Sequence, residues 1–132
     1  MFLARQSLSL ASTMLALCLS VTPLRSQSMS GNLTHFPEQS GEALYKTICQ
    51  GCHMPDAKGA TGAGSYPALA NNAKLGNAGY PLLVVIRGQK AMPPFGGSLS
   101  DKQIAAVVNY VRSHFGNDYL QDVTVEDVKA AR

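Results

Sequence analysis

Two cysteines and a histidine lie within five consecutive positions, in the sequence CQGCH at residues 49–53. This cluster limits the possible folds more than any other feature, because it can hold a metal ion, carry out disulfide exchange or attach a larger group. A structural zinc site normally takes four ligands, usually from two separated pairs. The other histidines, His35 and His114, show no paired spacing, so a zinc site has little support.

A thioredoxin-like dithiol is the second possibility for the cluster. Such a site places its cysteines between a strand and a helix in a chain of alternating strands and helices. The residues before Cys49 show a helical pattern and no convincing strand. The third possibility is covalent attachment of haem, which is indicated by a histidine directly after the second cysteine. Cys49 and Cys52 would then form thioethers with the haem vinyl groups, and His53 would bind the iron from one face.

A haem used for electron transfer commonly has a methionine opposite the histidine. Two of the five methionines lie in the first 28 residues, and Met29 follows them directly. Met54 adjoins His53, so it cannot easily reach the opposite face of the iron. Met92 remains, 39 residues after His53, in a segment rich in proline and glycine that favours a loop. A lone methionine is more often core filler, but this loop position favours iron ligation.

The composition is that of one ordered globular domain. Hydrophobic residues make up 45% of the 132-residue chain and charged residues 14%, which suits a single modest core. Lysines and arginines are scattered and form no basic run, so nucleic-acid binding is not indicated. No nucleophile, carboxylate pair or general base stands out, so we do not expect an enzyme active site.

The first 28 residues are typical of a secretory signal peptide. Arg5 is followed by an uncharged stretch through Val21, and small residues at Ser26 and Ser28 suit cleavage after position 28. The alternatives are a retained membrane anchor and a lipid anchor at Cys18, but the apolar stretch is short and rich in serine for a membrane span. Export leads to an oxidising compartment, where the two remaining cysteines would pair unless something else consumed them.

Four stretches of the chain together resemble class I c-type cytochromes. They match in order and spacing and cover most of residues 41–117: GEALYKTICQGCH, YPALANN, VIRGQKAMPPFGG and LSDKQIAAVVNYVRSHFGN. Within that family the chain is most similar to small cytochrome c subunits of bacterial periplasmic or membrane-bound dehydrogenases. The sequence HFGNDYLQDVTVEDVKAAR points to this subgroup.

The resemblance implies an all-α cytochrome c fold. Three to five helices would wrap around one covalently attached haem c, with the N- and C-terminal helices crossing. The chain would then divide into four regions: a signal peptide (1–28), an N-terminal linker (29–37), a cytochrome c domain (38–117) and a C-terminal tail (118–132).

The resemblance also implies roles for residues around the haem. Cys49 and Cys52 attach it, and His53 and Met92 are the axial ligands of the iron. The carbonyl of Pro67 accepts a hydrogen bond from the histidine ring and fixes its plane, unless Pro67 is simply a turn proline.

Further residues are expected near the haem. Tyr66, Asn72 or Tyr80 bonds a haem propionate or the methionine sulfur, and the sequence does not choose among them. Arg87 and Lys90 lie near the propionates, form a docking rim, or are solvated surface cations. Apolar residues are expected to wall the haem pocket and exclude water: Leu69, Leu82, Leu83, Val85 and Ile86.

Periodicity predicts a helix over residues 40–48. Gly41 within it costs helix stability, so we expect it to permit close approach by another helix. The resemblance to class I c-type cytochromes implies that this contact is with Tyr110, where the first and last helices cross. The apolar face of this helix has three members: Ala43, Leu44 and Ile48.

Two more helices are predicted after the loop segments. Ser100 and Gln103 form a capping box, and Gly116 marks the end of the helix that follows. Residues 80–86 predict a helix with proline in its first turn; a short buried strand is the alternative, but no partner strand is visible. The helix after the capping box carries apolar residues at helical spacing: Ile104, Val107, Val108 and Val111.

The expected function is that of a periplasmic monohaem cytochrome carrying single electrons from a dehydrogenase towards the respiratory chain. Its partners would be redox proteins, and membrane contact would occur through a partner or a retained N-terminal anchor. A free shuttle to a terminal oxidase is a close alternative. A haem-free thiol–disulfide oxidoreductase using Cys49 and Cys52 is the alternative from a different class. The tail at 118–132, where Thr124 and Asp127 can cap a short helix, either packs on the body, docks to a partner or is loosely ordered.

Overall fold

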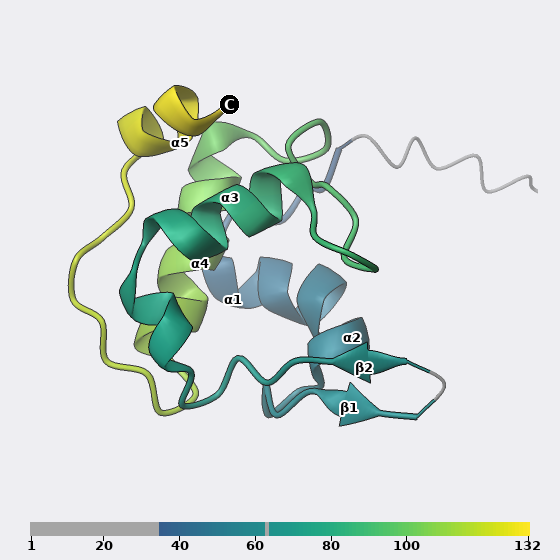
Figure 1. Ribbon diagram of the computed structural model, residues 1–132. Coiled ribbons are helices and arrows are strands. Elements are labelled where there is room, and N and C mark those ends of the chain that lie inside the picture. The colour runs from purple at the N-terminus through teal and green to yellow at the C-terminus, as the bar shows by residue number, and fades with distance from the viewer. Residues whose placement is uncertain (1–34, 63) are drawn as a thin grey trace, which may run out of the picture.

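The computed structural model describes residues 35–62 and 64–132; the predicted signal peptide and most of the predicted linker lie outside these residues. The described part is mostly helical, and its helices surround a core built largely on α4 (Figure 1). In chain order the elements are α1 (Gly41–Leu44), a π-helical segment η1 (Tyr45–Cys49), α2 (Gln50–His53), β1 (Ala60–Thr61), β2 (Ser65–Tyr66), a 3-10 helix η2 (Ala73–Gly76), α3 (Gly79–Arg87), α4 (Asp101–Ser113) and α5 (Val125–Ala131).

The first three elements form one continuous helix, longer than the predicted 40–48. The side chain of Ser40 caps its start by accepting a backbone hydrogen bond of 3.2 Å. The helix ends at Met54, whose φ of +66° turns the chain away. The helical prediction before Cys49 is therefore confirmed, but it stopped too early, because both cysteines lie on the helix itself.

The first helix crosses α4 at Gly41, as the sequence predicts (Figure 1). A Cβ on Gly41 would lie 2.6 Å from the Cβ of Tyr110, closer than real side chains approach. Tyr45, one turn further on, packs its ring 5.8 Å from that of Tyr110 and 4.8 Å from that of Phe115. Glycine thus lets the two backbones meet, and aromatic rings fill the space beside the crossing.

Helix α4 supplies most of the core. The predicted capping box is present: the Gln103 backbone donates to the Ser100 hydroxyl, and the Gln103 side chain accepts from the Ser100 backbone. The helix ends at Ser113, before the predicted stop, and the turn that follows has positive φ at Phe115 and Gly116. The four predicted apolar residues are all buried: Ile104, Val107, Val108 and Val111.

The predicted helix over 80–86 is confirmed as α3. The predicted all-α fold agrees with the mostly helical structure, to which β1 and β2 add a small antiparallel ladder. Ala60 pairs with Tyr66, and Thr61 pairs with Ser65. Strands of two residues are too short to show the alternation by which a strand is recognised in a sequence. Within the part of the chain that the structure describes, no helix has the length and hydrophobicity that a membrane span requires.

Residues 118–132 pack on the body of the protein. Thr124 and Asp127 form the predicted capping box at the start of α5, and Val128 on this helix is fully buried. The side-chain amide of Asn109 in α4 holds the segment before α5, because it donates to the Val123 carbonyl at 2.9 Å and accepts from its N–H at 2.8 Å. Of the three possibilities for the tail, packing on the body is the one observed.

A buried arginine, which the sequence analysis did not single out, joins the tail to the core. Arg112 in α4 is 1% exposed. Its guanidinium donates to the Leu75 carbonyl at 2.9 Å and to the Gln121 carbonyl. These bonds compensate the cost of burying the charge and fix the path of the tail across α4.

Candidate haem site

The end of the first helix presents the two thiols on one side. Cys49 and Cys52 are three residues apart, a spacing that places side chains on the same helix face. Both are free thiols; Cys52 is exposed, whereas Cys49 is half-buried against the hydrophobic core. The two sulfurs could therefore both form bonds to one group on this side of the helix.

His53, the last residue of α2, is held by a backbone carbonyl. Its Nδ1 lies 2.9 Å from the carbonyl oxygen of Pro67, and the residue is 8% exposed. A carbonyl can only accept, so Nδ1 carries the proton and Nε2 keeps a free lone pair. The hydrogen bond expected from the resemblance is thus present, and it leaves the imidazole in the tautomer that binds a metal through Nε2.

The loop after the helix brings Pro67 to the histidine. Within this loop, Gly59 contacts both the His53 backbone and the Pro67 backbone. The N–H of Gly59 donates to the His53 carbonyl at 3.0 Å, with φ at +69°. A Cβ at this position would lie 2.8 Å from the carbonyl carbon of Pro67. In the sequence, the only signal for this role of Gly59 is a glycine soon after the cluster.

Met92 lies in the loop between α3 and α4, as predicted, and is partly buried. It exchanges two backbone hydrogen bonds with Gln89, of 3.0 and 2.9 Å, which close a tight turn. In Figure 1 the tip of this loop and α2 both lie on the right-hand side of the molecule. Further along, the N–H groups of Phe95 and Gly96 donate to the carbonyls of Val85 and Ile86, at 2.9 and 3.1 Å.

The other expected residues have varied surroundings. Tyr66 in β2 is 38% exposed, and Leu69 packs against the core. The side-chain amide of Asn72 is committed to the local backbone, with bonds to the Ala68 carbonyl and the Lys74 N–H.

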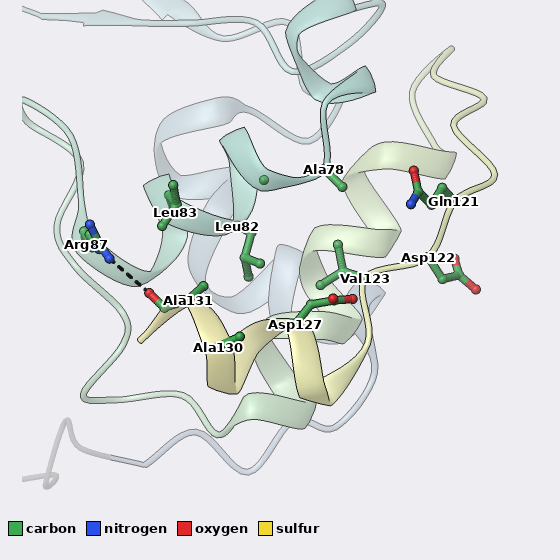
Figure 2. Close-up of a pocket in the computed structure, with 11 residues that line it drawn as sticks. Ala78, Leu82, Leu83, Arg87, Gln121, Asp122, Val123, Asp127, Ala130 and Ala131 are labelled. Atoms are coloured by element: carbon green, nitrogen blue, oxygen red, sulfur yellow. Dashed lines mark hydrogen bonds between the residues drawn. The ribbon is translucent and has the colours of Figure 1, made fainter.

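The residues of α3 that were expected near the haem have different neighbours: Tyr80 contacts the loop after α3, whereas three others line a cavity next to α5. The hydroxyl of Tyr80 donates to the side chain of Gln89 at 3.3 Å. Leu82 and Leu83 border an open cavity of about 470 Å³ between α3 and α5, which Arg87 also lines (Figure 2). Part of the apolar surface expected around the haem therefore faces the tail.

Burial raises the pKa values of two side chains on the first helix. It raises the pKa of Cys49 to about 12, with a smaller contribution from the neighbouring Cys52 thiol. Burial likewise raises the pKa of Tyr45 to about 12, and its hydroxyl donates to the Met54 carbonyl at 2.7 Å. Cys49 is therefore a neutral thiol at physiological pH.

The donor set suits covalently attached haem better than a zinc ion. Two thiols on one helix face, an imidazole with a free Nε2 and a thioether on a separate loop are the groups that haem c uses. Within residues 35–62 and 64–132, no three histidine, cysteine, aspartate or glutamate side chains are grouped so that they could hold a metal ion.

Known proteins resemble most of this chain. Residues 37–111 match the family described as cytochrome c oxidase, cbb3-type, subunit III. The cytochrome subunit of fructose dehydrogenase from Gluconobacter japonicus is 34% identical over 120 residues, which cover 80% of this chain and 24% of that protein. The gluconate 2-dehydrogenase cytochrome c subunit from Pantoea cypripedii is 32% identical over 110 residues, again 24% of that protein. The chain thus spans about a quarter of the length of these relatives.

A small cytochrome is matched over nearly its whole length. Cytochrome c6 from Microcystis aeruginosa is 36% identical over 73 residues, which cover 54% of this chain and 89% of that protein. The predicted resemblance is confirmed: the chain belongs to the cytochrome c family, a family that implies covalently bound haem c.

Proposed function

We infer that this protein is a periplasmic monohaem cytochrome that carries single electrons from a dehydrogenase towards the respiratory chain. The observation that carries this inference is the hydrogen bond from His53 to Pro67, directly after two thiols on one helix face. It prepares the imidazole as an iron ligand within the attachment motif of the family.

Each residue of the site has one task. Cys49 and Cys52 supply the sulfurs for the two thioether bonds, and His53 supplies Nε2 on one face. Met92 would supply the thioether sulfur as the second protein ligand of the iron, and ligation by histidine and methionine raises the reduction potential. Haem c supplies one-electron redox chemistry when bound. If His53 and Met92 both held the iron, small external ligands would find no open position, and the site would favour electron transfer.

The names of the relatives support a dehydrogenase as donor. Cytochrome subunits of fructose dehydrogenase, gluconate 2-dehydrogenase and quinone-dependent alcohol dehydrogenase all match this chain over 71–80% of its length. The near-complete match to cytochrome c6 favours a second candidate, a free shuttle that delivers electrons to a terminal oxidase, because the matched unit there is a whole small protein.

A thiol–disulfide oxidoreductase fits this structure poorly. Reactive cysteines of that class lie at helix N-termini and have lowered pKa values, because the nucleophile is the thiolate. Here the cysteines end a helix, and burial raises the pKa of Cys49 to about 12. The chain also lacks, among its described residues, the alternating strands and helices on which that site is built.

The test uses protein expressed from the full chain in a host that exports and attaches haem. Mass spectrometry should show a shortened polypeptide, cleaved near residue 28, carrying one covalent haem. An unmodified mass in this host would refute the function. The donor is then tested with ferric protein and membranes of the source organism, to which fructose, gluconate or ethanol is added. Haem reduction that depends on one substrate supports the dehydrogenase role. If none of the substrates reduces the haem, and the membranes oxidise protein that has first been chemically reduced to the ferrous state, the result supports the shuttle.

A further inference from the structure

The last two residues of the tail contact both ends of the loop that carries Met92. Arg87 ends α3, just before this loop, and its guanidinium donates to the carbonyl of Ala131 at 3.2 Å (Figure 2). Arg132 contacts the other end, where the loop leads into α4. Tail and loop are more than 30 residues apart in sequence, so these contacts exist only in the folded chain.

Arg132 makes three separate contacts with the exit of the loop. Its Nε pairs with the Asp101 carboxylate at 2.5 Å, and Nη2 donates to the Leu99 carbonyl at 2.9 Å. Nη1 donates to the carbonyl of Gly96, four residues after Met92. The side chains of Arg132 and Asp101 are only 34% and 24% exposed. A planar guanidinium can satisfy all three acceptors at once, which a lysine ammonium on its flexible stem does less well.

These contacts act on a segment that has few other supports. Between Met92 and α4, the N–H groups of Phe95 and Gly96 bond the chain to α3, and Leu99, which is 5% exposed, is buried in the core. The carbonyl of Gly96 accepts from Arg132, while its N–H donates to Ile86. Arg132 thus gives the segment after Met92 a second attachment, in addition to its hydrogen bonds to α3.

We propose that Arg132 is a positioning residue for Met92. Its contacts at the end of α5, which we call the clasp, hold the loop that carries the methionine in place. This proposal rests on the proposed function, in which Met92 is the sixth ligand. The clasp shifts the equilibrium between bound and released methionine towards the bound state. An external ligand that must displace Met92 therefore binds more weakly when the clasp is intact.

The experiment titrates imidazole into the ferric holoprotein and follows the loss of the visible band of methionine-ligated haem. Arg132→Ala should bind imidazole about tenfold more tightly than the native protein, which corresponds to the net loss of one hydrogen bond to a charged group. Arg132→Lys keeps the charge but not the planar fork, so it should also bind imidazole more tightly. Lys129→Ala removes an exposed cation from the same helix, makes none of these contacts, and should match the native affinity.

A double-mutant cycle shows whether the effect passes through Met92. In a Met92→Ala background there is no methionine to displace, so Arg132→Ala should leave the imidazole affinity unchanged. Native affinity in Arg132→Ala, or native affinity in Arg132→Lys, would overturn the clasp. An equal effect of Arg132→Ala with and without Met92 would overturn it too. A native protein with covalent haem but no methionine band would instead refute Met92 as ligand, which separates the two failures.

Discussion

Replacing Gly59 by alanine tests the link between the loop and the histidine. The φ of +69° at this position costs a residue with a side chain about 1–2 kcal/mol. The new Cβ would also lie 2.8 Å from the carbonyl carbon of Pro67 and 2.9 Å from the backbone nitrogen of Ala68. Overpacking of this kind typically costs about 1–3 kcal/mol, because the neighbouring backbone must move.

Together these two effects predict that Gly59→Ala lowers the free energy of unfolding by about 2–5 kcal/mol. The measurement is denaturant unfolding of the holoprotein, followed by circular dichroism. Gly62→Ala is the matched control in the same loop, because a Cβ there meets nothing within 4 Å. We expect this control to change stability by less than about 0.5 kcal/mol.

The same change should affect the haem through His53. Moving the backbone at Pro67 lengthens the 2.9 Å hydrogen bond to Nδ1, which makes the imidazole a weaker electron donor. The ferric state is then less stabilised, so the reduction potential should rise, while Gly62→Ala leaves it unchanged. Native stability and native potential in Gly59→Ala would show that the loop does not position the histidine.

Three further predictions concern the helix crossing, the sixth ligand and the thiols. In the same assay, Gly41→Ala should lower the free energy of unfolding by about 1–3 kcal/mol, because the new Cβ overlaps α4. In the control Gly51→Ala, where a Cβ meets nothing, helix propensity should raise it by about 1 kcal/mol. Equal effects of the two substitutions would contradict the close crossing. Met92→Ala should keep its covalent haem but show a lower potential in a redox titration, and an unchanged potential would mean that another residue holds the sixth position. In the haem-free chain at neutral pH, iodoacetamide should label Cys52 well before Cys49. The reason is that the pKa of about 12 keeps the Cys49 thiol protonated until strongly alkaline pH. Faster labelling of Cys49 would contradict its burial.

Local signals in the sequence predicted most of the helical frame. The capping boxes at Ser100 and Thr124 place the starts of α4 and α5 because the hydrogen bonds that cap a helix lie within a few residues of each other. Gly41 was predicted as a contact because a glycine inside a helix needs a packing reason. The predicted helix ends at residue 48, but the structure continues it to His53. The segment Tyr45–Cys49 is π-helical, so the residues that follow it do not keep the α-helical periodicity of the residues before it.

The site was predicted by a different route from the frame. The cluster at 49–53 carries its own chemistry in the sequence, but the acceptor carbonyl of Pro67 followed only from the family resemblance, since any residue offers a carbonyl. Arg112 and Arg132 were missed for the same reason. Arg112 donates to the Leu75 carbonyl, 37 residues away, and Arg132 donates to the Leu99 carbonyl, 33 residues away. Contacts of this range leave no local signal, so in the sequence each arginine looks like an ordinary surface cation.

The two sides of the proposed haem site are stabilised by contacts of different range. On the histidine side, the contacts of His53 with Gly59 and Pro67 lie within one short stretch of chain, and that stretch is fastened to the first helix. On the methionine side, the loop depends on α3 before it and on the tail after it, and the Arg132 contacts form only when the whole domain is folded. Local opening costs least where few contacts cross, so the methionine is the ligand that the fold can release. If Met92 is the sixth ligand, substitutions in the tail should change how firmly it binds the iron without altering the first helix.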